Sequence, residues 1–370
     1  MNFDFSDEQK LLQETARKFL GSECNTAVAR GILDSSAASY ARPLWDRISE
    51  LGWLGVTIPE RFGGLELGPV ALCAVAEELG RALAPVPFSS TLYLFTEALL
   101  LAGSDAQKAA LLPDVATGKV IGCLAVSERP GPTDASRLTA TVEGGRLSGS
   151  KLPVIDGAAA THAVVLAAED GAPSLYLASL ADPTVTAQRL EALDPTRGIA
   201  LLDFAATPVE RLGAPGEGEA LLRSIENRAA VYFAFEQLGG AERALELARD
   251  YALERYAFGR PIGSYQAIKH KLADMYVRNQ IARSNAYLGA WALESGVRLG
   301  SAAAAARIAA SEAFWYAAKE AIQVFGGIGA TWDADGHLYY RRAKQLALAI
   351  GAPALWKERL VVALEHELAG

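Results

Sequence analysis

The residues with the clearest capacity for chemistry lie in one glycine-containing stretch, residues 255–266, which reads RYAFGRPIGSYQ. Gly259 can take the left-handed position that ends one helix, and Ser264 can cap the start of the next. The free N–H groups and the dipole at a helix start favour an anion, and Arg255 and Arg260 add fixed positive charge. The stretch predicts a phosphate-binding turn, with an ordinary helix corner and solvated arginines as the alternative.

A second glycine cluster, residues 323–329, follows another helical run. Gly326 and Gly327 leave backbone N–H groups open to any ligand lying close. Alone this signal is weak, because glycine runs commonly just end helices. It is not a dinucleotide fingerprint of the Rossmann type, since no strand precedes it and the spacing differs. The sequence has no P-loop and no nucleophile elbow.

Composition limits the possible functions. The chain has 370 residues, of which 51% are hydrophobic and 21% charged, so a large core is available. A net charge of −8 argues against general nucleic-acid binding. The three cysteines are far apart, which indicates a reducing compartment and no metal site. With neither a signal peptide nor an apolar run long enough to span a bilayer, we expect a cytoplasmic protein without membrane contact.

The elements that must position these stretches predict an α+β multidomain fold. Residues 1–118 read as an N-terminal α-helical domain, in which Ser6 and Gln9 form a capping box. Residues 119–215 read as a central antiparallel β-barrel or sandwich, and residues 216–370 as a C-terminal four-helix bundle. The strand candidates are residues 120–126, 138–142, 163–166, 175–178, 185–187 and 199–204. The long bundle helices are expected over residues 219–253, 264–299, 301–325, 336–350 and 353–368, with Gly239 and Gly240 allowing close helix contact.

This order of domains, together with RxxFGRPIxxxQ and QxFGGxG, resembles the acyl-CoA dehydrogenase family over essentially the whole chain. The resemblance implies an FAD-dependent α,β-desaturation of an acyl-CoA thioester by a homo- or hetero-tetramer. It also implies that an electron-transfer flavoprotein accepts the electrons. FAD would lie between the β domain and the bundle, with its diphosphate–adenine end held by a neighbouring subunit. We therefore expect the two glycine corners to meet at a subunit boundary.

The resemblance also implies roles for individual residues. Arg255 and Gln266 would reach the FAD diphosphate, and Phe258 would pack near the adenosine half. The segment that faces the flavin in the family keeps two hydroxyls here. The expected FAD-binding residues are therefore Ser127, Thr133, Arg255, Phe258, Gln266, Gln323, Gly326 and Gly327.

The catalytic base of the family has no counterpart at either usual position. In the family a glutamate takes the α proton while the β hydrogen leaves as hydride to the flavin. Counting without gaps from the motifs, one position falls on Ile350 and the other on Ala229. Glu226 lies one turn from Ala229 and is more simply a solvated or interfacial glutamate. No catalytic residue is assigned.

The flavin-facing segments also differ from the family pattern. Between Ser127 and Thr133 a family glycine is replaced by Pro132, which removes a backbone donor. The Trp and Thr that flank the flavin ring in the family become Pro153 and Ile155.

Some bacterial members of the family are heterotetramers that pair a chain carrying the base with a chain lacking it. Enzymes of sterol side-chain degradation are among them. The departures in this sequence suggest that it is such a base-less partner. Three alternatives stay open. The chain could be an acyl-CoA dehydrogenase active alone, a silent structural subunit, or a family member that performs non-redox chemistry on acyl-CoA.

Overall fold

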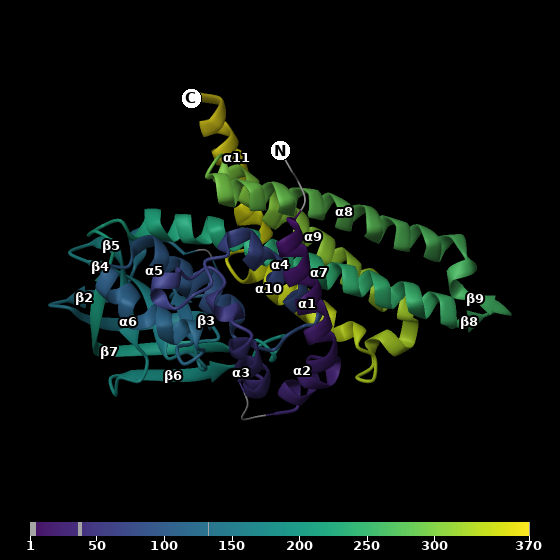
Figure 1. The fold of residues 1–370 in the computed structure, drawn as a ribbon, viewed down its shortest axis with the longest axis horizontal. Coiled ribbons are helices and arrows are strands. Elements are labelled where there is room, and N and C mark those ends of the chain that lie inside the picture. Colours follow the sequence, from purple (N-terminus) through teal and green to yellow (C-terminus); the bar gives the residue numbers. More distant parts are fainter. Residues whose placement is uncertain (1–4, 36–38, 132, 370) are drawn as a thin grey trace. The chain divides into compact units, whose positions relative to one another are not determined.

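The computed structural model describes residues 5–35, 39–131 and 133–369. Its element order is an N-terminal helical region, a central β region and a C-terminal helical region, which confirms the predicted fold class (Figure 1). The chain packs into two compact units: one contains Met1–Ala29, Pro69–Ala84 and Ala230–Gly370, the other Arg30–Gly68 and Pro85–Ala229. Each unit combines segments of the expected domains, so the domain boundaries stay predictions.

The first unit is helical. Ser6 caps its first helix as expected, because the Ser6 hydroxyl accepts from the Gln9 N–H at 3.2 Å and the Gln9 side chain accepts from the Ser6 N–H at 2.9 Å. The helices that lie wholly or partly in this unit are α1 (Asp7–Glu23), α2 (Thr26–Leu33), α4 (Gly68–Arg81), α7 (Gly218–Glu254), η5 (Ile262–Ser264), α8 (Gln266–Ser295), α9 (Leu299–Phe325), η6 (Gly326–Ala330), α10 (Gly336–Leu348) and α11 (Pro353–Ala369).

Glycines bring α4 and α7 into backbone contact. A Cβ at Gly80 would lie 1.8 Å from the carbonyl oxygen of Glu236, and a Cβ at Gly239 would lie 1.8 Å from the carbonyl oxygen of Glu77. The expected close helix contact at Gly239 is therefore present, with α4 as the partner helix. Any side chain at either glycine would force these two helices apart.

The second unit combines a sheet with short helices. Its helices are α3 (Arg42–Glu50), η1 (Trp53–Gly55), η2 (Glu60–Phe62), η3 (Ser89–Thr96), α5 (Glu97–Ala102), α6 (Asp105–Ala116) and η4 (Ala135–Arg137). η3 is a π-helix that continues directly into α5. Phe95 of η3 packs on Gly122, where a Cβ would lie 2.0 Å from its ring.

The sheet closes on itself. Its strands are β1 (Gly122–Ala125), β2 (Thr141–Glu143), β3 (Arg146–Ile155), β4 (His162–Glu169), β5 (Ala172–Ser179), β6 (Val185–Leu190) and β7 (Ile199–Leu212). The pairing β4-β2-β3-β7-β5 returns to β4, which makes a barrel, while β1 pairs with β4 and β6 with β7. β1 and β2 pair with β4 in parallel, so the sheet is not purely antiparallel. Buried aliphatic residues such as Val142, Leu147, Val165 and Leu202 fill the barrel.

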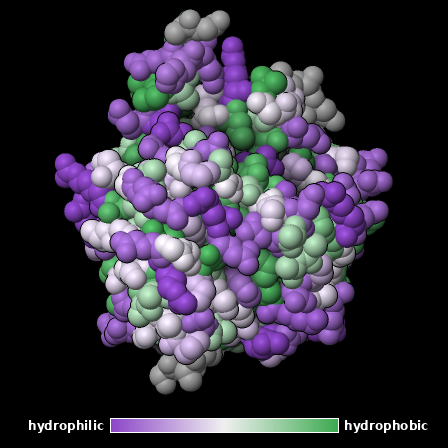
Figure 2. All heavy atoms as spheres, turned by 90° about the vertical axis from the view of Figure 1, so that its left-hand side faces the viewer, coloured by the Kyte–Doolittle hydropathy of each residue, from purple (hydrophilic) through white to green (hydrophobic). Residues whose placement is uncertain are grey.

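Polar and hydrophobic residues intermingle on the face drawn in Figure 2. Exposed apolar side chains scattered in this way are normal for a protein surface. Among the described residues, no helix is long and apolar enough to cross a membrane.

Candidate nucleotide-binding site

The turn between α7 and α8 is a β-hairpin, which projects at one end of these two helices in Figure 1. α7 ends at Glu254, and β8 (Tyr256–Ala257) pairs with β9 (Arg260–Pro261) across Phe258 and Gly259. The φ angles of these two residues are 52° and 79°, as in a type I′ hairpin turn. Gly259 is therefore left-handed, but it lies in the hairpin and not at the helix end where the sequence placed it.

The predicted cap at the start of α8 is wrong. Tyr265 occupies the N-cap position without a side-chain cap, while the Ser264 hydroxyl donates to the Pro261 carbonyl at 2.7 Å. The Tyr265 hydroxyl donates to the Ala257 carbonyl at 2.9 Å, and the Arg260 guanidinium lies 4.0 Å from the centre of the Tyr265 ring. These side chains stabilise the hairpin itself, so Arg260 is already engaged there.

Three side chains at this turn remain open to a ligand. Arg255 and Gln266 are exposed, and neither side chain has a hydrogen bond or ion pair within the described part of the chain. Phe258, at the tip of the hairpin, is 98% exposed. A fixed cation and a free amide suit the diphosphate of a dinucleotide, and an exposed ring suits its adenosine half.

The second corner lies where α9 ends. Gly326 follows the last turn with φ 67°, and a Cβ built at Gly326 or Gly327 would meet nothing within 4 Å. Gln323 is exposed, and its side chain makes no hydrogen bond to any described residue. A ligand could therefore come close to this backbone without displacing protein atoms.

One chain brings both corners to the same end of its bundle. The ring of Tyr251, in the last turn of α7, packs edge-on against Phe325 at the end of α9, with centroids 4.9 Å apart. Arg255 and Gly326 follow these two residues by four positions and one position. The expected proximity of the corners is thus a feature of a single chain, and the subunit boundary between them and the flavin stays a prediction.

A cavity of about 600 Å³ adjoins the second corner. It is lined by Gln323 and, among others, by Lys271, Lys319, Glu320 and His337. Both lysines approach Glu320, Lys319 at 3.6 Å, so the wall carries one more positive than negative charge. Lys319 could not be predicted from the sequence, because a lysine in a helix gives no local sign that it faces a cavity.

The two predicted hydroxyls of the β region bond to each other. Ser127 Oγ and Thr133 Oγ1 lie 2.9 Å apart, and the Ser127 carbonyl accepts from the Leu152 N–H of β3 at 2.9 Å. They lie in the second unit, and the six bundle residues of the predicted set lie in the first. Pro132 lies outside the described residues.

A buried ion pair that the sequence analysis missed holds this segment. Glu128 accepts from Lys151 Nζ at 2.8 Å and from the N–H groups of Thr139 and Ala140 at 2.7 and 2.9 Å. Burial opposes ionisation, but these donors outweigh it and lower the pKa of Glu128 to about 2. The fully buried Lys151 has a pKa lowered by desolvation.

Residues 153–156, where the aromatic and hydroxyl residues of the family are replaced, end in a second buried ion pair. Asp156 has φ 55°, and its carboxylate accepts from Arg197 at 3.0 Å and from Ser90 Oγ at 2.8 Å. Asp156 and Arg197 are each 3% exposed. Their charges are thus balanced inside the second unit, and Asp156 is closed to a ligand.

The position expected for the catalytic base is apolar and closed. Ile350 is 6% exposed, and its carbonyl accepts from the Trp356 indole N–H at 3.0 Å. Gly351, with φ 97°, completes the turn. Ala229, the alternative position, is fully buried. Neither side chain can accept a proton.

The residues of the bundle corners fit the diphosphate end of FAD. They offer one guanidinium and two amides that bond to no described residue, and a glycine backbone with open space above it. No group of three or more His, Cys, Asp or Glu side chains among the described residues could hold a metal ion.

Models of a known protein family match most of the chain. The family model "Acyl-CoA dehydrogenase, N-terminal domain" matches residues 6–119, and "Acyl-CoA dehydrogenase, C-terminal domain" matches residues 217–360. The chain belongs to the acyl-CoA dehydrogenase family. Members of this family are flavoproteins that oxidise acyl-CoA substrates.

Relatives of this acyl-CoA dehydrogenase family member cover 94% of its length or more. Acyl-CoA dehydrogenase IpdE2 of Mycobacterium tuberculosis is 35% identical over 94% of both chains. The solved structure of a Tcur3481-Tcur3483 steroid acyl-CoA dehydrogenase (ACAD) variant has 31% identity and a TM-score of 0.89, covering 98% of this chain and 99% of that one. The ChsE4-ChsE5 complex from Mycobacterium tuberculosis has 26% identity and a TM-score of 0.90, with 99% of each chain covered.

Proposed function

We propose that this chain is the base-less subunit of a mixed FAD-dependent acyl-CoA dehydrogenase. The observation that carries the proposal is the buried Ile350 at the position of the proton acceptor. A second chain of the same family would then supply the glutamate that removes the α proton. This chain would complete the FAD site of that second chain through its bundle corners.

The closed turn at Ile350 supports a loss of base function. The Trp356 indole holds the Ile350 carbonyl, so the backbone is fixed and ordered where a base would need to be positioned. A general base contributes a factor of about 10²–10⁴ to a rate. A chain that lacks the general base but keeps an ordered fold is best explained as one subunit of an assembly in which a partner chain supplies the base.

The open bundle corners support a role in holding a dinucleotide. The Arg255 guanidinium would pair with the diphosphate, Gln266 and Gln323 would donate amide N–H groups, and the Gly326 and Gly327 backbone would lie close to the nucleotide. FAD bound there would accept the β hydrogen of the substrate as hydride. The phenyl ring of Phe258 would cover the apolar side of the nucleotide and keep water away.

Two of the similar structures support the mixed assembly and a substrate class. One is the ChsE4-ChsE5 complex, and the other, Tcur3481-Tcur3483, is a steroid acyl-CoA dehydrogenase variant. We infer a heterotetramer that acts on a bulky acyl-CoA such as a steroid thioester. The electron acceptor is inferred to be an electron-transfer flavoprotein.

Co-expression tests the proposal. This chain should be produced with each family member encoded beside it, and the purified complex assayed for FAD by visible absorbance and for acyl-CoA oxidation. We expect FAD and activity only in a mixed complex whose partner carries a glutamate at the base position. A homo-oligomer of this chain with one FAD per chain and full activity would overturn the proposal.

Ile350→Glu separates a missing base from a missing flavin site. If this chain holds a complete flavin of its own, restoring the carboxylate should raise its solitary activity by about 10²-fold or more. We expect no such gain, because Pro153 and Ile155 replace the residues that flank the flavin ring in the family. Ile350→Gln is the matched control, because glutamine has nearly the size and shape of glutamate but cannot act as a base.

A further inference from the structure

Two neighbouring glutamates of α4, Glu77 and Glu78, are buried in the first unit, and each is 1% exposed. Helix α1 contacts both of them. Gln13 Nε2 donates to Glu77 at 3.0 Å, and Arg17 donates to Glu78 through two N–H groups, at 3.0 and 2.7 Å. Within α1 itself just two apolar side chains are buried. The polar contacts to the two glutamates are therefore a large part of what attaches α1 to α4.

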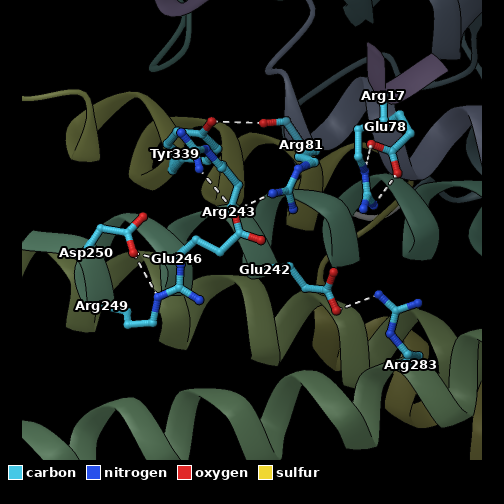
Figure 3. A network of polar contacts seen from close by, with 10 residues as sticks. All are labelled: Arg17, Glu78, Arg81, Glu242, Arg243, Glu246, Arg249, Asp250, Arg283 and Tyr339. Atoms are coloured by element: carbon cyan, nitrogen blue, oxygen red, sulfur yellow. Dashed lines mark hydrogen bonds and ion pairs between the residues drawn. The ribbon is translucent and has the colours of Figure 1, made fainter. Parts of the chain in front are cut away.

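The two glutamates differ in how they meet their cations. Glu78 faces the guanidinium of Arg17, which binds it with two N–H groups (Figure 3). Glu77 shares its cation, because Arg283 Nη2 of α8 donates to Glu77 at 2.7 Å and also to Glu242 of α7. Since one nitrogen atom binds both carboxylates, Glu77 and Glu242 lie close together. Each negative charge makes ionisation of the other carboxyl less favourable.

The charges around Glu77 do not balance. Three carboxyl groups, Glu77 included, face two guanidiniums, Arg17 and Arg283. The charged groups next to this cluster cancel one another, and they are Arg81, Arg243, Glu246 and Asp335. Tyr339, which bonds Arg243, is uncharged at neutral pH because its pKa is raised by burial. A surplus of one negative charge therefore remains, and binding one proton removes it.

Burial makes Glu77 the favoured position for this proton. Loss of contact with water is the largest effect, and together with Glu242 and Glu78 it raises the pKa of Glu77 against the attraction of Arg283. Glu242 is 21% exposed, so water can solvate its charge. A protonated Glu77 keeps both of its hydrogen bonds. The Gln13 amide can turn over so that its oxygen accepts from the Glu77 O–H, while the other Glu77 oxygen still accepts from Arg283.

We propose that Glu77 carries a proton at neutral pH and that this proton holds α1 against α4. When the proton leaves at higher pH, the Glu77 carboxylate competes with Glu242 for one guanidinium in a buried site. Lifting α1 relieves this competition, because it lets water reach the two buried glutamates. The attachment of α1 therefore weakens as the pH rises. This inference does not depend on the proposed dehydrogenase function.

The direction of the pH dependence follows from the raised pKa. A carboxyl of this kind binds its proton more tightly in the folded than in the unfolded chain. Its stabilising contribution is complete below the unfolded pKa of about 4.3 and is lost as the pH rises toward the folded pKa. Glu128 behaves in the opposite way, because its pKa is lowered.

Urea unfolding of the full chain at pH 5 and pH 8 tests the proton. Glu77→Gln is the informative variant, because glutamine has the shape and hydrogen-bonding pattern of the protonated carboxyl. Between the two pH values the unfolding constant of the parent should rise about tenfold or more relative to that of Glu77→Gln. A ratio that stays constant, or that changes in the other direction, would overturn the proposal.

Glu78→Gln is the matched control. Glu78 is the neighbouring and equally buried glutamate, and Arg17 binds its carboxylate with two N–H groups. The unfolding constant of the parent should not rise relative to that of Glu78→Gln between pH 5 and pH 8. A rise as large as the one for Glu77→Gln would refute the assignment of the proton to Glu77.

Hydrogen exchange tests whether α1 is the element that loosens. After correction for the intrinsic pH dependence of exchange, the protection of residues 7–23 should fall about tenfold between pH 5 and pH 8 in the parent. It should stay constant in Glu77→Gln. Residues 299–325 of α9 are the internal control and should keep their protection. Equal losses in both helices, or no loss in α1, would contradict the proposed role of the proton.

Discussion

Three polar side chains at the bundle corners (residues 255–266 and 323–329) are exposed and, within the described chain, unpaired, whereas Asp156 in the β3 segment (residues 153–156) is buried and paired. At the corners, Arg255, Gln266 and Gln323 are exposed and bond to no described residue. At the end of β3, Asp156 and Arg197 are each 3% exposed and bond to each other. The resemblance to the family implies that both regions face its flavin, and of the two only the corners leave donors for a ligand.

We expect this difference in a chain that has lost one side of a cofactor site and kept the other. A buried charge must be paired, so a segment that no longer faces a ligand needs partners within the protein. An exposed charge carries no such requirement, and it can stay unpaired until a ligand arrives. The internal pairing of the β3 segment and the open corners are both consistent with a chain that serves the flavin of a partner.

Breaking the buried pair should have the largest effect. Arg197→Met leaves the Asp156 carboxylate buried without its cation, which should cost about 3–5 kcal/mol of unfolding free energy. Urea unfolding of the full chain measures this. Arg42→Met is the control, because Arg42 and Asp46 form an exposed pair at 2.7 Å whose attraction is screened by water. Equal losses in the two variants would show that Asp156 is not closed inside the unit.

Sequence reasoning predicted the corners better than the β segment, for a physical reason. The turn at Arg255 could be predicted because the residues that break the helix there lie within twelve positions of one another. Two details were wrong, since Ser264 is not the cap and Gly259 lies in a hairpin. The close contact at Gly239 was also correct, because a glycine in a long helix has few other uses.

The β region depends on contacts that the local sequence does not show. β3 was not predicted, because Gly149 and Pro153 interrupt its alternation and read as turn residues. The pair Asp156–Arg197 joins residues 41 positions apart, and Glu128–Lys151 joins residues 23 apart. Barrel closure through β4 and β5 is likewise a long-range pairing. Only the folded chain brings these groups together.

Acid should weaken the β segment before the corners. The pKa of Glu128 is lowered to about 2, so its stabilising contribution is complete above its unfolded pKa of about 4.3 and is lost as the pH falls toward 2. A shift of this size is worth at most about 3 kcal/mol, since desolvation of Lys151 opposes the pair. Urea midpoints between pH 6 and pH 2.5 measure the loss, and Glu128→Gln should flatten the profile. An unchanged profile in that variant would assign the acid sensitivity to other carboxylates.

At the corners the effect should fall on ligand binding and not on folding. Arg255→Met removes a charge-assisted contact worth about 1.5–3 kcal/mol, so FAD in the mixed complex should bind about 10- to 100-fold more weakly. The urea midpoint should stay within error of the parent, because the Arg255 side chain touches no described partner. Arg249→Met, which removes only an exposed pair with Asp250, should leave FAD binding unchanged. FAD content after gel filtration separates the two variants.

The smallest expected effect comes from adding one methyl group at Gly327, which tests whether a ligand occupies the open space at the second corner. Gly327 has no positive φ, and a Cβ there would meet nothing within 4 Å, so Gly327→Ala should be neutral or stabilise the chain by up to about 1 kcal/mol. In the mixed complex the added methyl should nevertheless weaken FAD about tenfold, about 1.4 kcal/mol, because it fills space that the nucleotide needs. Gly31→Ala adds the same methyl to open space on α2 and should leave FAD binding unchanged. Equal FAD affinity in the two variants would mean that the corner at Gly327 is open merely to solvent, and the contrast with the β3 segment would then rest on the side chains of Arg255, Gln266 and Gln323.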